Sequence, residues 1–322
     1  MALVGLEELR AAQRRIAGVA VRTPLLPCPW ADQGTRRLWL KPENLQPTGA
    51  FKTRGAYNRL AALTDGERAR GVVAQSSGNH AQAVAYAARL LGIKAVIVMP
   101  DTSPAVKVAS TRSYGAEVIL VAPGERDTLP AELAERHGHV WVPPYDDPYI
   151  IAGQGTVGLE IAEDAPDGLD TVLVPVSGGG LVSGTAAALK LTRPGVRVIG
   201  VEPELAADAQ ASLRAGERQI WPVADTYRTI ADGLRTPSVG VLPFEHIRAY
   251  VDDIVTVSED EIRDTVAVLA RRGRLVAEPS GAVATAAYLH RAAELDGRVF
   301  AAVVSGGNIE PRLLAELLAT GA

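Results

Sequence analysis

Lys52 is the residue of this chain whose type and context best fit covalent chemistry. It lies in the run PTGAFKTRGAYN, with Ala50 and Phe51 before it and Arg54 after it. An unperturbed lysine, with a pKa of about 10.4, is almost wholly charged at pH 7, and its amine condenses with an aldehyde only after it has lost the proton. Burial and a nearby cation both lower a lysine pKa. The context therefore predicts a lysine that forms a covalent bond with a carbonyl compound. The remaining lysines have the context of ordinary solvated surface charges: Lys41, Lys94, Lys107 and Lys190.

A glycine run provides a second candidate site. Ser177-Gly178-Gly179-Gly180-Leu181 follows the valine-rich run TVLVPV and precedes the helix-forming run LVSGTAAALKL. Glycines allow backbone N–H groups to converge, and a helix N-terminus attracts an anion. The run matches neither the G-x-G-x-x-G dinucleotide pattern nor a Walker loop. A tight turn between strand and helix is the alternative, but this context favours a phosphate cradle.

Two further strand ends carry polar side chains. Ser76, Ser77, Gly78, Asn79 and His80 follow the run VVAQ and precede a helical pattern, which suits a carboxylate ligand. Helix capping explains one of these residues but not the whole cluster. Ser305 ends the run VFAAVV, where a functional hydroxyl and a simple turn residue are equally favoured.

Glu202 and Asp208 form an acidic pair that could hold a hard cation. They follow the run VRVIGV, and an intervening carbonyl oxygen would complete such a site. A solvated acidic loop is an equally good interpretation of this pair. The chain has no Cys/His spacing that suggests zinc.

The elements that must position these residues alternate along the chain. Valine- and isoleucine-rich strands, such as AVIVMP and TVLVPV, take turns with helical patterns, which predicts parallel sheets covered on both faces. One set of strands lies between about residues 71 and 146. We therefore predict two doubly wound α/β domains, with a small domain (71–146) inserted in a large one (1–70 and 147–322). Ligands of such sheets bind beyond the carboxyl ends of the strands, so we expect the site in the interdomain cleft.

Composition limits the classes of partner. The chain has 322 residues, 47% of them hydrophobic, and a net charge of −4. No basic stripe suggests a nucleic-acid partner, and no apolar run is long enough to span a membrane. The N-terminal segment lacks the continuous apolar core of a signal peptide. Cys28 is the only cysteine, so no internal disulfide can form. We expect a cytoplasmic protein with a buried, unreactive Cys28.

Together these motifs resemble those of pyridoxal-phosphate enzymes of the tryptophan-synthase-β fold, in particular the threonine/serine dehydratase and serine racemase group. The resemblance covers nearly the whole chain from RTPLL onwards. It includes WLKPENLQPTGAFKTRGA, SSGNHAQA, PPYDDPYIIAGQGT, VPVSGGGL, IADGLRT, VDDIVTVSEDEI, AEPSGA and VSGGN. It implies two α/β domains with pyridoxal 5'-phosphate between them, and the dimers usual in this family.

The resemblance assigns a role to each candidate residue. Lys52 would form the Schiff base, Phe51 would pack near the cofactor ring and Asn79 would donate to its phenolic oxygen. Ser305 would face the pyridine nitrogen. The phosphate would bind the backbone of Ser177, Gly178, Gly179, Gly180 and Leu181. The substrate carboxylate would lie among Ser76, Ser77 and His80. The racemase-like cation site, for Mg²⁺ or Ca²⁺, would consist of Glu202, the carbonyl of Ala206, and Asp208.

The implied reaction is β-elimination of water from L-threonine or L-serine, giving a 2-oxo acid and ammonia. A hydroxyl at Ser305 leaves the ring nitrogen neutral, which favours elimination over a long-lived carbanion, while Lys52 removes the Cα proton. Ala81 and Tyr145 depart from the racemase pattern, whereas Ser77 agrees with it and could return a proton from the opposite face. A serine racemase or 3-hydroxyaspartate dehydratase therefore stays open as an alternative. A silent ligand-binding module of the same fold is disfavoured by the intact Lys52, and a nicotinamide dehydrogenase by the missing fingerprint.

Overall fold

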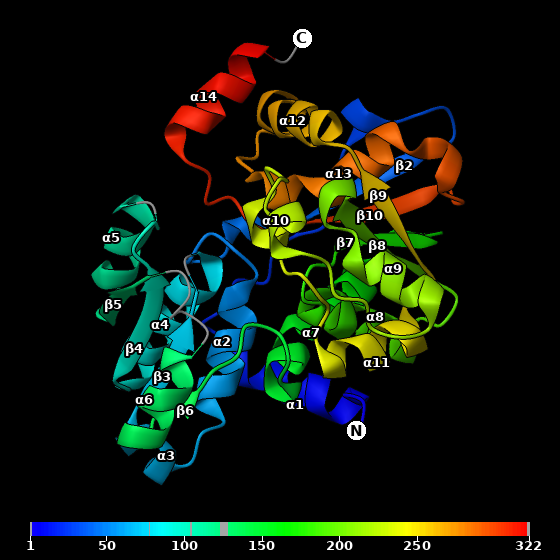
Figure 1. Cartoon of the computed structure of the whole chain (residues 1–322). Coiled ribbons are helices and arrows are strands. Elements are labelled where there is room, and N and C mark those ends of the chain that lie inside the picture. The colour runs from blue at the N-terminus through cyan, green and yellow to red at the C-terminus, as the bar shows by residue number, and fades with distance from the viewer. Residues whose placement is uncertain (1, 77, 104, 123–127, 321–322) are drawn as a thin grey trace.

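The computed structural model describes residues 2–76, 78–103, 105–122 and 128–320. Helices and strands alternate along the chain and form two separate sheets, each flanked by helices (Figure 1). The predicted α/β class with parallel sheets is therefore confirmed. In the part of the chain that is described, no helix is both long and apolar enough to cross a membrane.

The larger sheet has six strands in the order β1-β2-β10-β7-β8-β9. All neighbours are parallel except β1 and β2. Its strands are β1 (Leu26–Pro27), β2 (Arg37–Pro42), β7 (Thr171–Pro175), β8 (Arg197–Pro203), β9 (Asp253–Val257) and β10 (Val299–Val304). The sheet thus combines an N-terminal strand pair with strands from the second half of the chain.

The smaller sheet has four parallel strands in the order β5-β4-β3-β6. They are β3 (Val72–Gln75), β4 (Ala95–Pro100), β5 (Glu117–Val121) and β6 (Val140–Trp141). All four lie within one continuous stretch of sequence that interrupts the strands of the larger sheet. The domain boundaries at residues 70 and 147 stay a prediction, and Ala56, Leu60 and Ile150 outside them join the apolar core of this sheet.

Helices cover both sheets (Figure 1). In the first half of the chain they are α1 (Leu6–Ile16), α2 (Lys52–Ala61), α3 (Asp65–Arg70), α4 (Asn79–Leu91), α5 (Ala105–Ser113), α6 (Leu129–His137) and α7 (Pro148–Asp164). In the second half they are α8 (Gly180–Thr192), α9 (Asp208–Ala215), α10 (Val223–Thr226), α11 (Val241–Tyr250), α12 (Glu259–Val268), α13 (Pro279–His290) and α14 (Pro311–Thr320).

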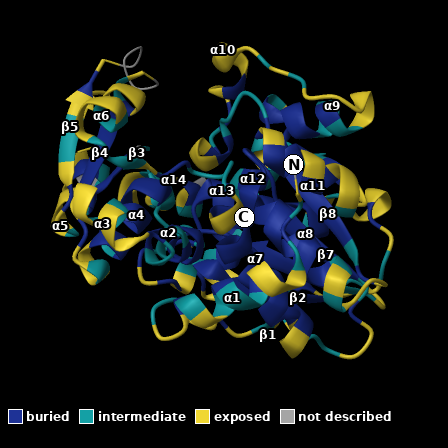
Figure 2. Ribbon diagram, turned by 90° about the horizontal axis from the view of Figure 1, so that it is seen from below, coloured by how far each residue is buried: buried dark blue, intermediate teal, exposed yellow. Residues whose placement is uncertain are grey.

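Alternating side chains of the larger sheet enter two different cores, as expected for a sheet buried on both faces. On β10, Phe300, Ala302 and Val304 pack into the core with α12 and α13. Ala301 and Val303 pack on the other face, into the core with α7, α8 and α11. Figure 2 shows the resulting dark-blue interior around α7, α8 and β7. This two-sided burial gives the sheet a rigid edge on which to place functional loops.

A buried ion cluster joins α2 to the larger sheet. Arg54 donates to Glu43 (2.7 Å) and to Glu160 on α7 (2.6 Å), and Lys41 on β2 donates to Glu160 (2.6 Å). The side chains of Lys41, Arg54 and Glu43 are fully buried. The prediction that Lys41 is a solvated charge is therefore wrong, because its partners lie far away in sequence. The cluster fixes the first turn of α2, where Lys52 begins the helix.

Candidate active site

The segment that precedes Lys52 and the segment that begins at Ser305, far apart in sequence, are paired in the structure. The N–H of Phe51 donates to the carbonyl of Ser305 (3.0 Å), and the N–H of Gly307 donates to the carbonyl of Gly49 (2.9 Å). Ala50 and Gly306 form an isolated antiparallel bridge between these contacts. The start of α2 is thus attached to the carboxyl end of β10, as both site predictions require.

The Lys52 amine lies in an environment that favours its neutral form. Its Nζ donates to the carbonyl of Pro144 (2.6 Å) and lies 5.1 Å from the centroid of the Phe51 ring. Burial lowers the pKa of Lys52 to about 8. Roughly a tenth of such amines are neutral at pH 7, which is about 200 times the fraction of an ordinary lysine. Lys52 can therefore act as a nucleophile or a base near neutral pH.

The glycine run forms a tight turn between β7 and α8. Gly179 has φ 93° and Ser177 has φ 53°, both in the left-handed region. A Cβ atom at Gly178 would lie 2.3 Å from the Tyr145 ring, and one at Gly179 would lie 2.7 Å from Pro243. Larger residues would therefore not fit at either position. Because α8 starts at Gly180, its first N–H groups and its dipole face this turn, which suits an anion.

Residues 142–146 connect these parts of the site. The carbonyls of Val142 and Pro144 contact His80 (3.0 Å) and Lys52 (2.6 Å) respectively. The Tyr145 ring packs on Gly178, and the Asp146 carboxylate accepts from the first N–H groups of α11. This segment, which we call the 142–146 strap, was not predicted as part of the site. Residues 143–146 stood in a motif of the resemblance, in which Tyr145 was noted only as a departure from the racemase pattern.

His80 is neutral in this environment. Burial, together with the nearby Lys52 charge, lowers the pKa of His80 to about 3. A neutral ring that donates from Nε2 to Val142 leaves Nδ1 as an acceptor, and Nδ1 is buried without a partner among the described residues. Ser76 accepts from the N–H of Gly78 (3.1 Å) at the start of α4. Ser77, predicted to contact substrate and return a proton, lies outside the described residues.

Asn79, the first residue of α4, faces the segment that follows β10. Its Nδ2 donates to Glu278 Oε1 (2.6 Å), and its Oδ1 accepts from Asn308 Nδ2 (2.7 Å). Ser305, which is buried, lies in the same region, and its hydroxyl donates to the carbonyl of Ser280 (3.4 Å). The structure thus joins Asn79, through Asn308, to the segment that contains Ser305, and the same segment pairs with the residues before Lys52.

Ser177 has a hydroxyl partner that the sequence did not reveal. Its Oγ lies 2.8 Å from Oγ1 of Thr236, and Ser177 itself is buried. The two hydroxyls carry two hydrogens, and their mutual bond uses one of them. The pair thus retains a donor next to the glycine turn.

Glu202 and Asp208 lie together as a carboxylate pair, and Glu202 accepts from the N–H groups of Ala209 (3.3 Å) and Gln210 (2.8 Å). Both are fully buried, and both oxygens of Asp208 lack a partner among the described residues. Burial, with the neighbouring Asp208 adding to it, raises the pKa of Glu202 well above its usual range, and burial raises the pKa of Asp208 to about 7. Ala206, which lies between these two residues in the sequence, is also buried. Within the described residues no cluster of three His, Cys, Asp or Glu side chains gathers, so a cation here would need carbonyl or water ligands.

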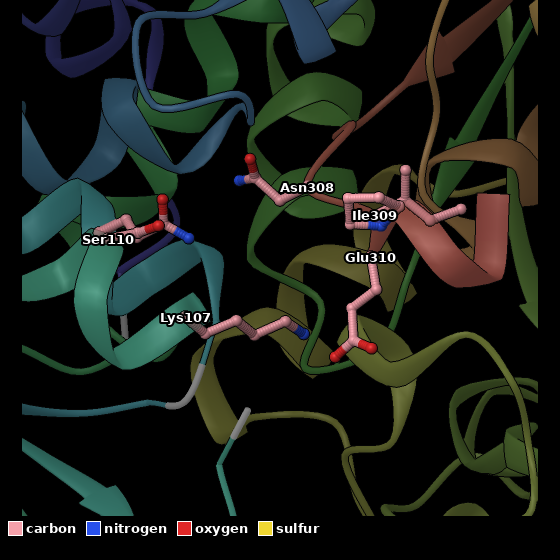
Figure 3. Close-up of a pocket in the computed structure, with 7 residues that line it drawn as sticks. Lys107, Ser110, Asn308, Ile309 and Glu310 are labelled. Carbon is pink, nitrogen blue, oxygen red and sulfur yellow. The ribbon is translucent and has the colours of Figure 1, made fainter. Parts of the chain in front are cut away.

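A small hollow of ≈ 90 Å³ lies beside Asn308, lined from α4, α5 and the segment before α14. Figure 3 shows Lys107 and Ser110 on one side of it, and Asn308, Ile309 and Glu310 on the other. Lys107 also forms an ion pair with Asp232 (2.5 Å), which links α5 to the body of the larger sheet.

The residues present fit pyridoxal phosphate. The glycine turn excludes side chains where a phosphate would bind, Lys52 is a half-buried amine that loses its proton readily, and His80 presents a nitrogen without a partner among the described residues. Glu278, Asn308, Tyr145 and Thr236 are the side chains of this region that sequence reasoning missed. All four lie in motifs of the resemblance, and that was the only available signal.

Comparison with known proteins agrees with this geometry. The sequence profile described as "pyridoxal-phosphate dependent enzyme" matches residues 16–306. The chain is 44% identical over 322 residues to the L-threonine ammonia-lyase of Thermotoga maritima, covering 99% of this chain and 79% of the relative. The crystal structure of the threonine deaminase from "T.th." is 45% identical with a TM-score of 0.89, covering 95% of this chain and 99% of that one. Maize serine racemase is 38% identical with a TM-score of 0.92, covering 99% and 98% respectively. The chain therefore belongs to the family of pyridoxal-phosphate dependent enzymes.

Proposed function

We propose that this enzyme is an L-threonine/L-serine ammonia-lyase, which eliminates water from the substrate and yields a 2-oxo acid and ammonia. One observation carries the proposal: the half-buried Lys52 amine, with its lowered pKa, contacts the strap that packs against the glycine turn. The ammonia-lyase of T. maritima and the deaminase from "T.th.", which carry threonine in their names, support the choice of substrate.

The proposed site holds the cofactor at several points. Lys52 would carry it covalently, Phe51 would pack on its ring, Asn79 would donate to its phenolic oxygen and Ser305 would face its ring nitrogen. The phosphate would bind at the turn of Ser177, Gly178, Gly179, Gly180 and Leu181. When bound, pyridoxal phosphate supplies an electron sink that makes the Cα–H bond of an amino acid acidic.

Proton transfer is the task of the protein's own residues. Lys52 would be the base that takes the proton from Cα, because its amine loses its own proton near pH 8. Ser76, Ser77 and the neutral His80 would bind the substrate carboxylate through hydroxyl groups, backbone N–H groups and the ring. Ser305 offers a hydroxyl and no negative charge, so it does not hold a proton on the ring nitrogen. Ser305 would thereby limit electron withdrawal by the ring and favour prompt loss of the β-hydroxyl group.

The test is a panel of β-hydroxy amino acids. L-Threonine should yield 2-oxobutyrate and L-serine should yield pyruvate, each with one equivalent of ammonia. Lys52→Ala should abolish both products. Absence of oxo acid from threonine, serine and 3-hydroxyaspartate, with cofactor bound, would exclude an ammonia-lyase.

A racemase activity is the second candidate, and the buried Glu202–Asp208 pair favours it. This pair matches the cation site implied by the racemase-like members, for which we propose Mg²⁺ or Ca²⁺ held with the carbonyl of Ala206. Chiral chromatography after incubation with L-serine tests this candidate, and the absence of D-serine would rule it out. A Ser77→Ala variant should lose racemisation and keep elimination.

We further propose that the enzyme is a homodimer in the cytoplasm. The predicted dimer follows from the family, and the lone buried Cys28, whose thiol pKa burial raises to about 12, suits a reducing compartment. Light scattering of the purified enzyme tests the dimer.

A further inference from the structure

Glu278 is a buried carboxylate beside the candidate cofactor site. It is 4% exposed and precedes α13, and within the described chain no salt bridge reaches it. Burying a carboxylate without a cation is costly, so its retention calls for a specific partner. Its hydrogen bond from Asn79, at 2.6 Å, identifies that partner.

The orientation of the Asn79 amide follows from its neighbours. Asn308 Nδ2 donates to the carbonyl of Thr48 (2.8 Å), which can only accept, so that atom of Asn308 must be nitrogen. The same Nδ2 lies 2.7 Å from Asn79, so the Asn79 atom facing it must be the acceptor Oδ1. Nδ2 of Asn79 is then fixed toward Glu278. One of its two hydrogens bonds Glu278, and the other has no acceptor among the described residues.

The position of the Glu278 carboxyl group is fixed as well. The Glu278 N–H donates to the carbonyl of Gly306 (3.1 Å). A Cβ atom at Gly306 would lie 2.3 Å from Glu278 Oε1 and 3.2 Å from Asn79 Nδ2, so only glycine allows this approach. Gly306 immediately follows Ser305. The carboxyl group is therefore held on the segment that the cofactor ring would face.

We propose that Glu278 is a positioning residue, which holds the Asn79 amide so that its second N–H points to the phenolic oxygen of the bound cofactor. The proposal rests on the proposed cofactor site. Glu278 does not touch the reacting atoms and acts only through Asn79.

The bond to Asn79 persists across neutral pH. Burial, with Asp232 adding to it, raises the pKa of Glu278 to about 7, although the Asn79 bond and Lys107 act against the rise. A carboxylate and a carboxylic acid both keep an acceptor oxygen for the Asn79 N–H. The amide therefore stays oriented when Glu278 takes up a proton.

The test is a double-mutant cycle on cofactor binding, with pyridoxal phosphate titrated into apoprotein. A hydrogen bond to a charged group contributes roughly 1.5–3 kcal/mol, and Asn79→Ala should therefore weaken cofactor binding about 10- to 100-fold. Glu278→Ala should weaken it to a similar extent, and the double variant should bind no more weakly than Asn79→Ala alone. The visible absorbance band of the bound cofactor should shift in the same direction in both single variants, because both change the donor at the phenolic oxygen.

Three further variants complete the design. Glu278→Gln keeps an acceptor and should stay within a few-fold of wild type. Gly306→Ala displaces the carboxyl group without removing it and should reproduce the Glu278→Ala effect, which provides a second route if Glu278→Ala does not fold. Glu132→Ala, which removes an exposed carboxylate from α6, is the control and should bind cofactor as wild type does.

Additive losses in the double variant, or cofactor binding that is unchanged in both Glu278→Ala and Gly306→Ala, would overturn the proposal. A wild-type enzyme that binds cofactor but makes no oxo acid would refute the ammonia-lyase proposal only. The binding cycle can still be read in that case, so the two failures are distinguishable.

Discussion

The buried ion cluster below Lys52 allows a prediction of stability from charge balance. It contains two cations, Lys41 and Arg54, and two carboxylates, Glu43 and Glu160. Glu160 accepts from Arg54 at 2.6 and 2.8 Å and from Lys41 at 2.6 Å. Glu160→Gln keeps the shape of the side chain but leaves one positive charge in excess in a buried space. Removing one partner of a buried ion pair costs about 3–5 kcal/mol.

This free energy converts into a melting temperature. An unfolding entropy of about 2.1 cal/mol/K per residue gives about 0.7 kcal/mol/K for 322 residues. Glu160→Gln should therefore lower the Tm measured by calorimetry by about 4–7 °C. The cluster also anchors the first turn of α2, so the loss should be accompanied by weaker cofactor binding at Lys52.

Glu163 provides a matched control on the same helix. It also pairs with two cations, Arg10 and Arg22, but its side chain is 32% exposed compared with 6% for Glu160. Exposed pairs contribute about 0–1 kcal/mol. Glu163→Gln should change the Tm by no more than about 1.5 °C. Equal Tm losses in the two variants, or a loss below about 1.5 °C in Glu160→Gln, would refute the reasoning from burial.

Three further predictions concern the site. Deprotonation of Lys52 exposes its nucleophilic amine. The rate of cofactor uptake by apoprotein should therefore rise about tenfold per pH unit below pH 8 and level off above it. A rise that continues to about pH 10 would indicate an ordinary lysine. Gly178→Ala places a Cβ atom 2.3 Å from the Tyr145 ring and should weaken cofactor binding about tenfold. Gly195→Ala is the control: a Cβ atom there meets open space, so cofactor binding should be unchanged. At a concentration of about 100 times its Kd, Mg²⁺ or Ca²⁺ should raise the Tm of the wild-type protein by about 4 °C. The same ion should leave the Tm of the Asp208→Asn variant unchanged. A wild-type Tm that does not respond to either ion would contradict the cation site.

The sequence predicted the fold class because parallel strands and their covering helices leave a strong alternating pattern. It also selected Lys52 from its flanking residues and the glycine turn from its place between a strand and a helix, whereas for Ser305 the residues alone left a simple turn equally favoured and only the resemblance gave it a role. The sequence contains no local pattern that indicates how the two sheets are placed relative to each other. The contact of the Lys52 segment with Ser305 therefore became visible only in the structure.

Buried polar pairs were the least predictable part. Lys41 was taken for a surface charge, although Glu160, more than a hundred residues away in sequence, neutralises it in the interior. Glu278 precedes a proline at the start of α13, and this local pattern does not indicate that its side chain is buried. Its contact with Asn79 joins two distant motifs, and neither motif contains a signal for the other.

The attachment of the cofactor to Lys52 is the claim on which the account depends most. We expect borohydride reduction of the yellow enzyme, followed by peptide mass mapping, to find the reduced cofactor on the peptide that contains Lys52, and to find none after Lys52→Ala. Label on Lys41, Lys94, Lys107 or Lys190, or a protein that takes up no cofactor at all, would contradict it.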